Sequence, residues 1–171
     1  MSVRRFFAKA LLPLTLLAAQ SASQAGTLGT FTSDAQGFDT HTYYYDDGKE
    51  VTVIDTQFTP ALTQAMVEQI RKQTSSPITR VVVTHPNPDK FNGLSVLHAL
   101  GAVSIASKAA ADAMQGVHDY KKYFFVNMAK MFTDDNYPRF EPIRQTFRGQ
   151  TTLRLKSGET ISLFELQHAG V

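Results

Sequence analysis

One short segment of the chain holds several side chains whose types and spacing could do chemistry. It reads His85-Pro86-Asn87-Pro88-Asp89-Lys90. A short loop between a strand and a helix can direct alternate side chains toward one place, and His and carboxylate groups are ligands of divalent cations. The chain contains no cysteine, which excludes a thiolate nucleophile and a zinc–thiolate site. Any metal ion must therefore be held by His, Asp, Glu, Asn or water.

The same segment also has an ordinary structural interpretation. Pro86 and Pro88 restrict the loop and push the residues before them, His85 and Asn87, into extended backbone. Asp89 is well placed to cap the helix that follows. On these residues alone the structural interpretation is favoured, and a role in metal binding needs further support.

The elements predicted around this segment place it at the edge of a sheet. Val81-Val82-Val83 is the most apolar part of a strand predicted over 78–84, and its composition suits a central strand buried on both faces. The loop leads into a helix predicted from about Phe91 to Leu100, which Gly101 ends. In open α/β sheets, ligands bind beyond the carboxyl ends of the strands, so a site is expected at this loop.

The rest of the chain alternates between predicted strands and helices. A helix begins with Thr59 as N-cap and Pro60 in its first position, and Ser107 is expected to cap a later one. The remaining predictions are β structure over 30–58 with a turn at Asp46-Asp47-Gly48, a strand over 103–106, a helix over 108–132 interrupted near Gly116, and a hairpin over 146–155 and 160–166. This order predicts an α/β (α+β) fold with a mixed sheet and covering helices.

Three separated segments resemble the metallo-β-lactamase superfamily. Residues 81–93 resemble the family pattern T-H-x-H-x-D-H-x-x-G after a buried strand. Ile54-Asp55-Thr56 looks like its I-D-T segment, and Gln167-His168-Ala169-Gly170 looks like its later histidine in a G-H-x-x-G setting. The resemblance implies a metallo-β-lactamase-like αββα sandwich, of which this chain holds mainly the N-terminal half.

The resemblance also implies a set of metal ligands, which this sequence keeps only in part. His85 and Asp89 match the motif, and His168 matches the ligand supplied later in the chain. Asn87 replaces the second histidine and Lys90 replaces the last one. His85, Asn87, Asp89 and His168 then imply one weakly held ion, with zinc the expected metal. A protonated Lys90 cannot coordinate a metal and repels a second cation, although its ammonium could occupy that cation's place electrostatically.

The activity that the resemblance implies is hydrolysis of an ester, lactone, lactam or related bond in a small molecule, with a metal-bound water as nucleophile. Asp89 is the candidate catalytic residue. Two alternatives stay open: a non-catalytic binding protein on the same fold, favoured by Asn87 and Lys90, and an inactive fragment of a longer hydrolase, because the chain stops soon after His168. An incomplete fold would expose a sheet edge that a second copy or a partner would cover.

Polar and aromatic residues outside the motif have weaker interpretations. Asp55 could support a metal ligand from behind or accept hydrogen bonds from loop amides. His98 is expected on a helix surface, and His41 and His118 in loops or strands. An aromatic and methionine stripe over 120–132 could line a substrate groove, but its helical spacing favours the core.

The amino terminus has the order of features of an export signal. Basic residues precede an apolar stretch that is too short to span a bilayer, and small residues follow at a cleavage position. These are Arg4, Arg5 and Lys9, then 10–19, then Ser23-Gln24-Ala25. Residues 1–25 are therefore expected to be a signal peptide, and 26–171 a C-terminally incomplete metallo-β-lactamase-like domain. An anchoring or buried first helix is the alternative.

The signal also bears on localisation and partners. Residues 4–9 resemble the twin-arginine pattern R-R-x-F-x-K, and the choice between this route and general secretion stays open. The expected location is periplasmic or secreted, without stable membrane insertion. Three of the 17 basic residues and none of the 15 acidic ones lie in the signal, so the rest of the chain has a formal charge of −1. The basic pI is thus no evidence for nucleic-acid binding, which is not expected.

Overall fold

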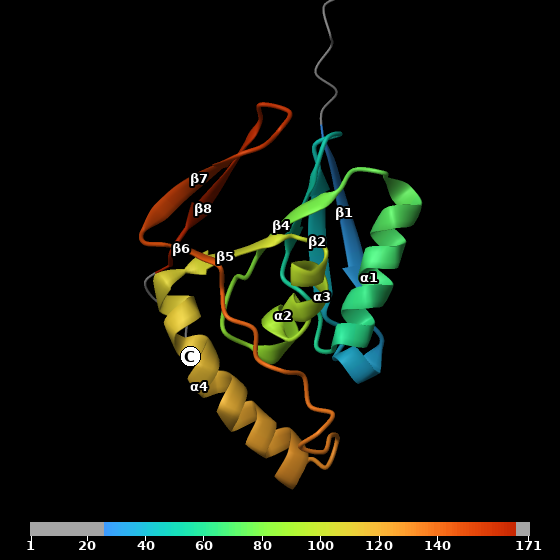
Figure 1. Cartoon of the computed structure of the whole chain (residues 1–171), viewed down its shortest axis with the longest axis vertical. Coiled ribbons are helices and arrows are strands. Elements are labelled where there is room, and N and C mark those ends of the chain that lie inside the picture. Colours follow the sequence, from blue (N-terminus) through green and yellow to red (C-terminus); the bar gives the residue numbers. More distant parts are fainter. Residues whose placement is uncertain (1–25, 167–171) are drawn as a thin grey trace, which may run out of the picture.

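The computed structural model describes residues 26–166, which form a layered α/β fold around one six-stranded sheet (Figure 1). The strand order is β1-β2-β3-β4-β5-β6, with antiparallel pairing from β1 to β3 and parallel pairing from β3 to β6. The strands are β1 (Thr27–Thr32), β2 (His41–Asp46), β3 (Val51–Ile54), β4 (Ile78–Val82), β5 (Val103–Ser107) and β6 (Gln145–Phe147). The predicted α/β class with a mixed sheet is confirmed.

The helices begin and end largely where local chemistry directs them. They are η1 (Ala35–Gly37), α1 (Pro60–Gln73), α2 (Pro88–Phe91), α3 (Leu94–Ala99), α4 (Lys108–Tyr123) and η2, a π-helical turn (Phe124–Met128). The predicted caps are confirmed: Thr59 Oγ1 accepts from the Leu62 amide at 3.2 Å, and Ser107 Oγ from the Ala110 amide at 3.1 Å. Gly101 follows α3 with a φ of 86°, a left-handed conformation that glycine adopts readily.

Successive side chains at the end of β4 point to opposite faces of the sheet, and each face has its own hydrophobic cluster. Val81 and Val83 belong to the cluster that α1, α3 and α4 cover, whereas Val82 lies in the cluster on the opposite face. That second face is covered by a two-stranded antiparallel sheet, β7 (Gln150–Arg154) and β8 (Thr160–Phe164). Figure 1 shows this hairpin on the side of the sheet away from α1. The prediction that β4 is buried on both faces is confirmed.

Three predicted boundaries were wrong. The helix expected from Phe91 begins earlier, at Pro88, and is divided into α2 and α3 at Asn92–Gly93. The next helix continues without interruption through Gly116, where an added Cβ atom would meet no other atom within 4 Å. Residues 146–147 belong to β6 of the large sheet, because they pair with β5 and not with β8.

The aromatic stripe after residue 119 divides between core and surface. Phe125 is buried with Phe58 and Tyr137 in an aromatic cluster at the end of α4. Tyr120 and Met128, in contrast, are more than 60% exposed. The expectation that the whole stripe is core was therefore wrong for its outward-facing members.

Two acidic residues after β2 fasten the β7–β8 turn to the large sheet. Asp47 accepts from the Ser157 amide at 2.8 Å. Glu50, which is 1% exposed, accepts from the Lys156 amide at 2.9 Å and from Arg80 Nη1 at 2.6 Å. We call Asp47, Glu50 and the amides of Lys156 and Ser157 the carboxylate clasp.

The predicted signal peptide, residues 1–25, and His168 lie outside the described residues. Among residues 26–166, no helix has the length and apolar character needed to cross a membrane.

Candidate functional site

The loop that carries His85 is tied to the end of the neighbouring strand β3. Asp55, the first residue after β3, accepts from the Thr84 amide at 2.8 Å and from the Thr84 hydroxyl at 2.9 Å. The Asp55 amide in turn donates to the Val82 carbonyl at 2.7 Å. These bonds bear out the interpretation in which the Asp55 carboxylate accepts a hydrogen bond from a loop amide, and they fix the residue directly before His85.

A second contact between the two segments lies deeper. The Thr56 amide donates to the Lys90 carbonyl at 2.9 Å, and the Gly93 amide donates to Thr56 Oγ1 at 3.1 Å. The fold therefore places 54–56 directly against 84–93, which are two of the three segments that resemble the metallo-β-lactamase superfamily.

His85 and Asn87 form a close pair within the loop. The Asn87 side-chain nitrogen lies 3.1 Å from His85 Nε2, and Thr84 Oγ1 lies 3.1 Å from His85 Nδ1. The orientation of a side-chain amide is assigned from such contacts, and a half-turn would present its oxygen beside the imidazole instead. An imidazole nitrogen and an amide oxygen together make a weak, neutral donor pair for one cation.

Lys90 places a positive charge beside Asp89 and Asp55. Its Nζ lies 3.0 Å from Asp89 Oδ2 and 4.0 Å from Asp55 Oδ2. The Lys90 side chain is 17% exposed, and those of Asp89 and Asp55 are 24% and 9% exposed. The ammonium therefore sits where two partly buried carboxylates converge.

Burial raises the pKa of the Asp55 carboxyl above its ordinary value of 3.8. The bonds from Thr84 and the charges of Lys90 and His85 act in the opposite direction and lower this pKa in part. Desolvation outweighs these contacts because Asp55 is only 7% exposed.

Asp89 was expected to cap the helix that follows the loop, but it does not occupy the N-cap position. Asn87 occupies the N-cap position of α2 and Pro88 the first helical position, so Asp89 lies in the first turn, where it pairs with Lys90. A carboxylate in the first turn is still favourably placed in the field of a helix.

The metal donors that were predicted from the sequence are brought together only in part. His85 and Asn87 are in contact, whereas Asp89 is engaged by Lys90. Within residues 26–166, no group of three or more His, Asp or Glu side chains converges to hold a metal ion. A second ion does not fit at Asp55 and Asp89, because the Lys90 ammonium already lies within 4.0 Å of both carboxylates and would repel it.

A Ser–His–Glu arrangement, which was not predicted, lies behind α3. His98 Nε2 is 2.9 Å from Ser104 Oγ, and His98 Nδ1 is 3.3 Å from Glu141 Oε2. Ser104 is fully buried, and its Oγ also accepts from the Arg144 amide at 2.9 Å. Ser104 thus has no access to a substrate, and the arrangement joins 141–144 to β5. Glu141 is 43 positions from His98 in the sequence, and no local pattern pairs His98 with Ser104.

The other histidines have structural surroundings. His98 was expected on a helix surface, but its side chain is 6% exposed, and burial lowers its pKa although Glu141 raises it. His118 was expected in a loop or strand, but it is buried on α4, with Nε2 2.9 Å from the Pro138 carbonyl oxygen. His41 lies exposed on β2, as expected.

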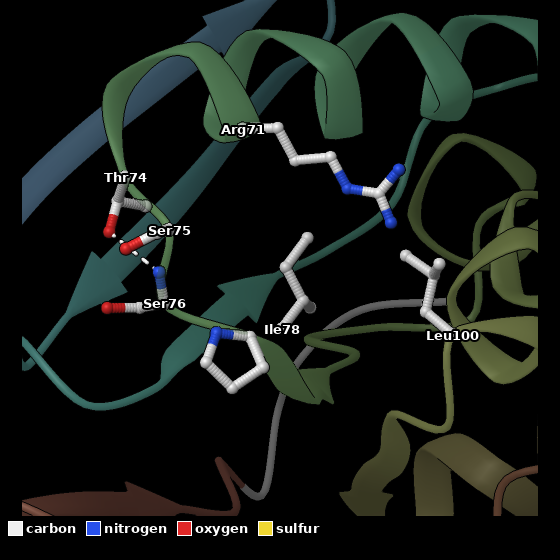
Figure 2. A pocket seen from close by; sticks show the side chains of 7 residues that line it. Arg71, Thr74, Ser75, Ser76, Ile78 and Leu100 are labelled. Atoms are coloured by element: carbon white, nitrogen blue, oxygen red, sulfur yellow. Dashed lines mark hydrogen bonds between the residues drawn. The ribbon is translucent and has the colours of Figure 1, made fainter.

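A hollow of about 340 Å³ lies at the opposite end of β4 from His85 (Figure 2). Its polar lining comes from Arg71 and from Thr74, Ser75 and Ser76, and its apolar lining from Pro77, Ile78 and Leu100. Figure 2 shows the Thr74 hydroxyl bonded to the Ser76 amide. The lining contains no imidazole or carboxylate that could act as an acid or base.

No family model matches the chain. Among solved structures, the chain is similar to a crystal structure of a metallo-β-lactamase from Erythrobacter litoralis with β-mercaptoethanol in its active site. The identity is 22% and the TM-score 0.45, and the match covers 53% of this chain and 41% of that one. The matched part thus spans less than half the length of that protein.

Proposed function

We propose that the chain is an exported, hydrolase-like protein of the metallo-β-lactamase type, whose functional site is the His85 loop and which binds a single, weakly held metal ion. The observation that carries this proposal is the hydrogen-bonded series from Asp55 through Thr84 to His85 and Asn87. It joins two of the segments that resemble the superfamily and orients two metal donors beyond the carboxyl ends of β3 and β4.

The donors proposed for this ion are His85, Asn87, Asp89 and His168, with zinc as the expected metal. Bound there, a divalent cation would supply Lewis-acid polarisation of a scissile ester, lactone or lactam group and of a water molecule. The protein's own contribution is positioning. Thr84 holds one imidazole nitrogen of His85, so the other faces Asn87.

The role of Asp89 follows from its pairing with Lys90. The Asp89 carboxylate lies 3.0 Å from the ammonium, and its oxygens can also accept hydrogen bonds from a polar substrate group or a water molecule. We therefore propose Asp89 as the residue that acts at the reacting centre.

Metal content tests this proposal. The full chain, purified without chelators and loaded with zinc, manganese or iron, is expected to retain about one ion by native mass spectrometry. His85→Ala should lose this ion, because it removes the strongest neutral donor. His41→Ala removes an exposed histidine on β2 and should retain it.

Retention of the ion by His85→Ala, or no ion in the unaltered chain under any loading condition, would overturn the proposal. A panel of small esters, lactones and thioesters then separates hydrolysis from binding alone. Binding of one ion without turnover would favour the second candidate, a non-catalytic binding protein, which the Lys90 ammonium beside Asp89 supports.

A further inference from the structure

We infer that the Lys90 ammonium is the resident cation of the Asp55–Asp89 carboxylate pair, in the half of the loop that would otherwise hold a second divalent ion. The inference deepens the proposed function, because it concerns the same site and limits the site to one ion. It predicts that this half of the site is assembled without any metal.

The position of the ammonium is set by backbone as well as side-chain contacts. The Lys90 amide donates to the Asn87 carbonyl, and the Lys90 carbonyl accepts from the Thr56 amide, both at 2.9 Å. The start of the side chain is therefore fixed between the two segments. Its Nζ reaches both carboxylates, at 3.0 Å from Asp89 and 4.0 Å from Asp55.

Because the Lys90 side chain is partly buried, its charge interacts more strongly with the two carboxylates than the charge of a surface lysine would. Two carboxylates that are largely removed from water repel each other unless a cation lies between them. Lys90 meets that need, since an ammonium offers three donors and a full positive charge. Lys108 and Asp112 form a contrasting pair on the surface of α4, with side chains 39% and 61% exposed, where solvent screens the interaction.

A divalent ion bound to the same carboxylates would lie close to the ammonium and be repelled by it. Removal of the lysine charge should therefore open a cation site, whereas its retention should keep the site closed. A histidine at position 90 would remove the fixed charge at neutral pH and add an imidazole donor to the two carboxylates.

Zinc titration of the full chain in a His85→Ala background tests the inference without the imidazole of His85, the strongest neutral donor of the proposed ion site. Lys90→His in this background is expected to lower the zinc dissociation constant at least tenfold and to make the unfolding temperature rise with added zinc. Lys108→His in the same background is the matched control and should change neither quantity. Lys90→Arg keeps the positive charge and should bind no more zinc than the chain with Lys90.

Zinc binding by the His85→Ala chain that is as tight as binding by its Lys90→His derivative would overturn the inference. The same holds for a folded Lys90→His chain that gains no zinc affinity. If Lys90→His does not fold, Lys90→Gln removes the charge with a smaller change in shape and carries the same expectation, with manganese as the probe for an oxygen-rich site. Because these chains lack His85, the zinc titration tests the role of Lys90 even if the unaltered chain binds no ion at His85.

Discussion

Asp55 is the residue on which the shape of the His85 loop depends most directly. Its φ of 65° lies in the left-handed region, which costs a residue other than glycine roughly 1–2 kcal/mol. The cost is offset by the bond that its amide donates to Val82 and by the two bonds that its carboxylate accepts from Thr84. The strained backbone is thus what turns the Asp55 carboxylate toward the loop.

Thr84→Val tests this dependence because it removes one donor and keeps the shape of the side chain. Since the acceptor is a partly buried carboxylate, we expect the free energy of unfolding in urea to fall by about 2 kcal/mol. Thr30→Val, at an exposed position on β1, should change it by less than about 0.5 kcal/mol. A double-mutant cycle with Asp55→Asn should give a coupling energy, and strict additivity would contradict the direct contact.

At the scale of single residues, the sequence predicted which residues share the loop but not every contact that they make. The spacing in the motif placed His85 and Asn87 on one loop, and in the structure His85 Nε2 lies 3.1 Å from Asn87 Nδ2. The first-turn position of Asp89 was missed because Asn87 takes the cap. The Ser104–His98 pair could not be predicted, since only the packing of α3 on β5 brings these side chains together.

Among the elements, α2 and α3 show what local signals miss. Caps at Thr59 and Ser107 were predicted because each depends on residues within one turn. The break between α2 and α3 was not predicted, and at this break Gly93 packs closely against α1, a contact between residues 30 positions apart. A Cβ atom at Gly93 would lie 1.8 Å from Thr63 Oγ1, and Thr63 is fully buried.

Gly93→Ala is therefore expected to force α1 and α3 apart. The free energy of unfolding should fall by about 1–3 kcal/mol, as for other overpacked cores. Gly116→Ala is the matched control, since a Cβ there meets no atom within 4 Å and alanine favours a helix interior by about 1 kcal/mol. Equal effects of the two substitutions, measured by urea denaturation, would show that the space at Gly93 is not limiting.

In the molecule as a whole, the carboxylate clasp decides how the β7–β8 sheet is held on the large one. Burial by itself raises the pKa of the Glu50 carboxyl, but bonds from Thr79, Arg80 and the Lys156 amide outweigh it and lower this pKa below 4.5. The pKa of Asp47 likewise lies below 3.8, because bonds from the amides of Ser157, Lys49 and Glu50 outweigh its burial. The sequence could not predict this clasp, because its partners are 106 and 110 residues apart.

Acid should therefore loosen the hairpin. Carboxylates whose pKa values are lowered by folding stabilise the protein fully above pH 4.5, and this contribution is lost as pH falls through 4.5 and 3.8 toward the folded-state values. Hydrogen exchange, corrected for its intrinsic pH dependence, should show faster opening of β7–β8 amides at pH 3.5 than at pH 7, relative to β3–β4 amides. Glu50→Gln should reproduce part of this opening at pH 7; unchanged hairpin exchange in both experiments would count against the clasp.

The carboxylates of the clasp and the β7–β8 hairpin are far apart in the sequence, and this separation also sets the order in which the parts of the fold are synthesised. Strands β1 to β5 pair with one another and end at residue 107, whereas the hairpin that covers Val82 and Ile105 begins some 40 residues later, at residue 150. At a typical synthesis rate of roughly 5–20 residues per second, that face of the sheet stays open to water, and to other chains, for seconds. The nascent chain is thus vulnerable to self-association on the face that β7 and β8 cover in the mature fold.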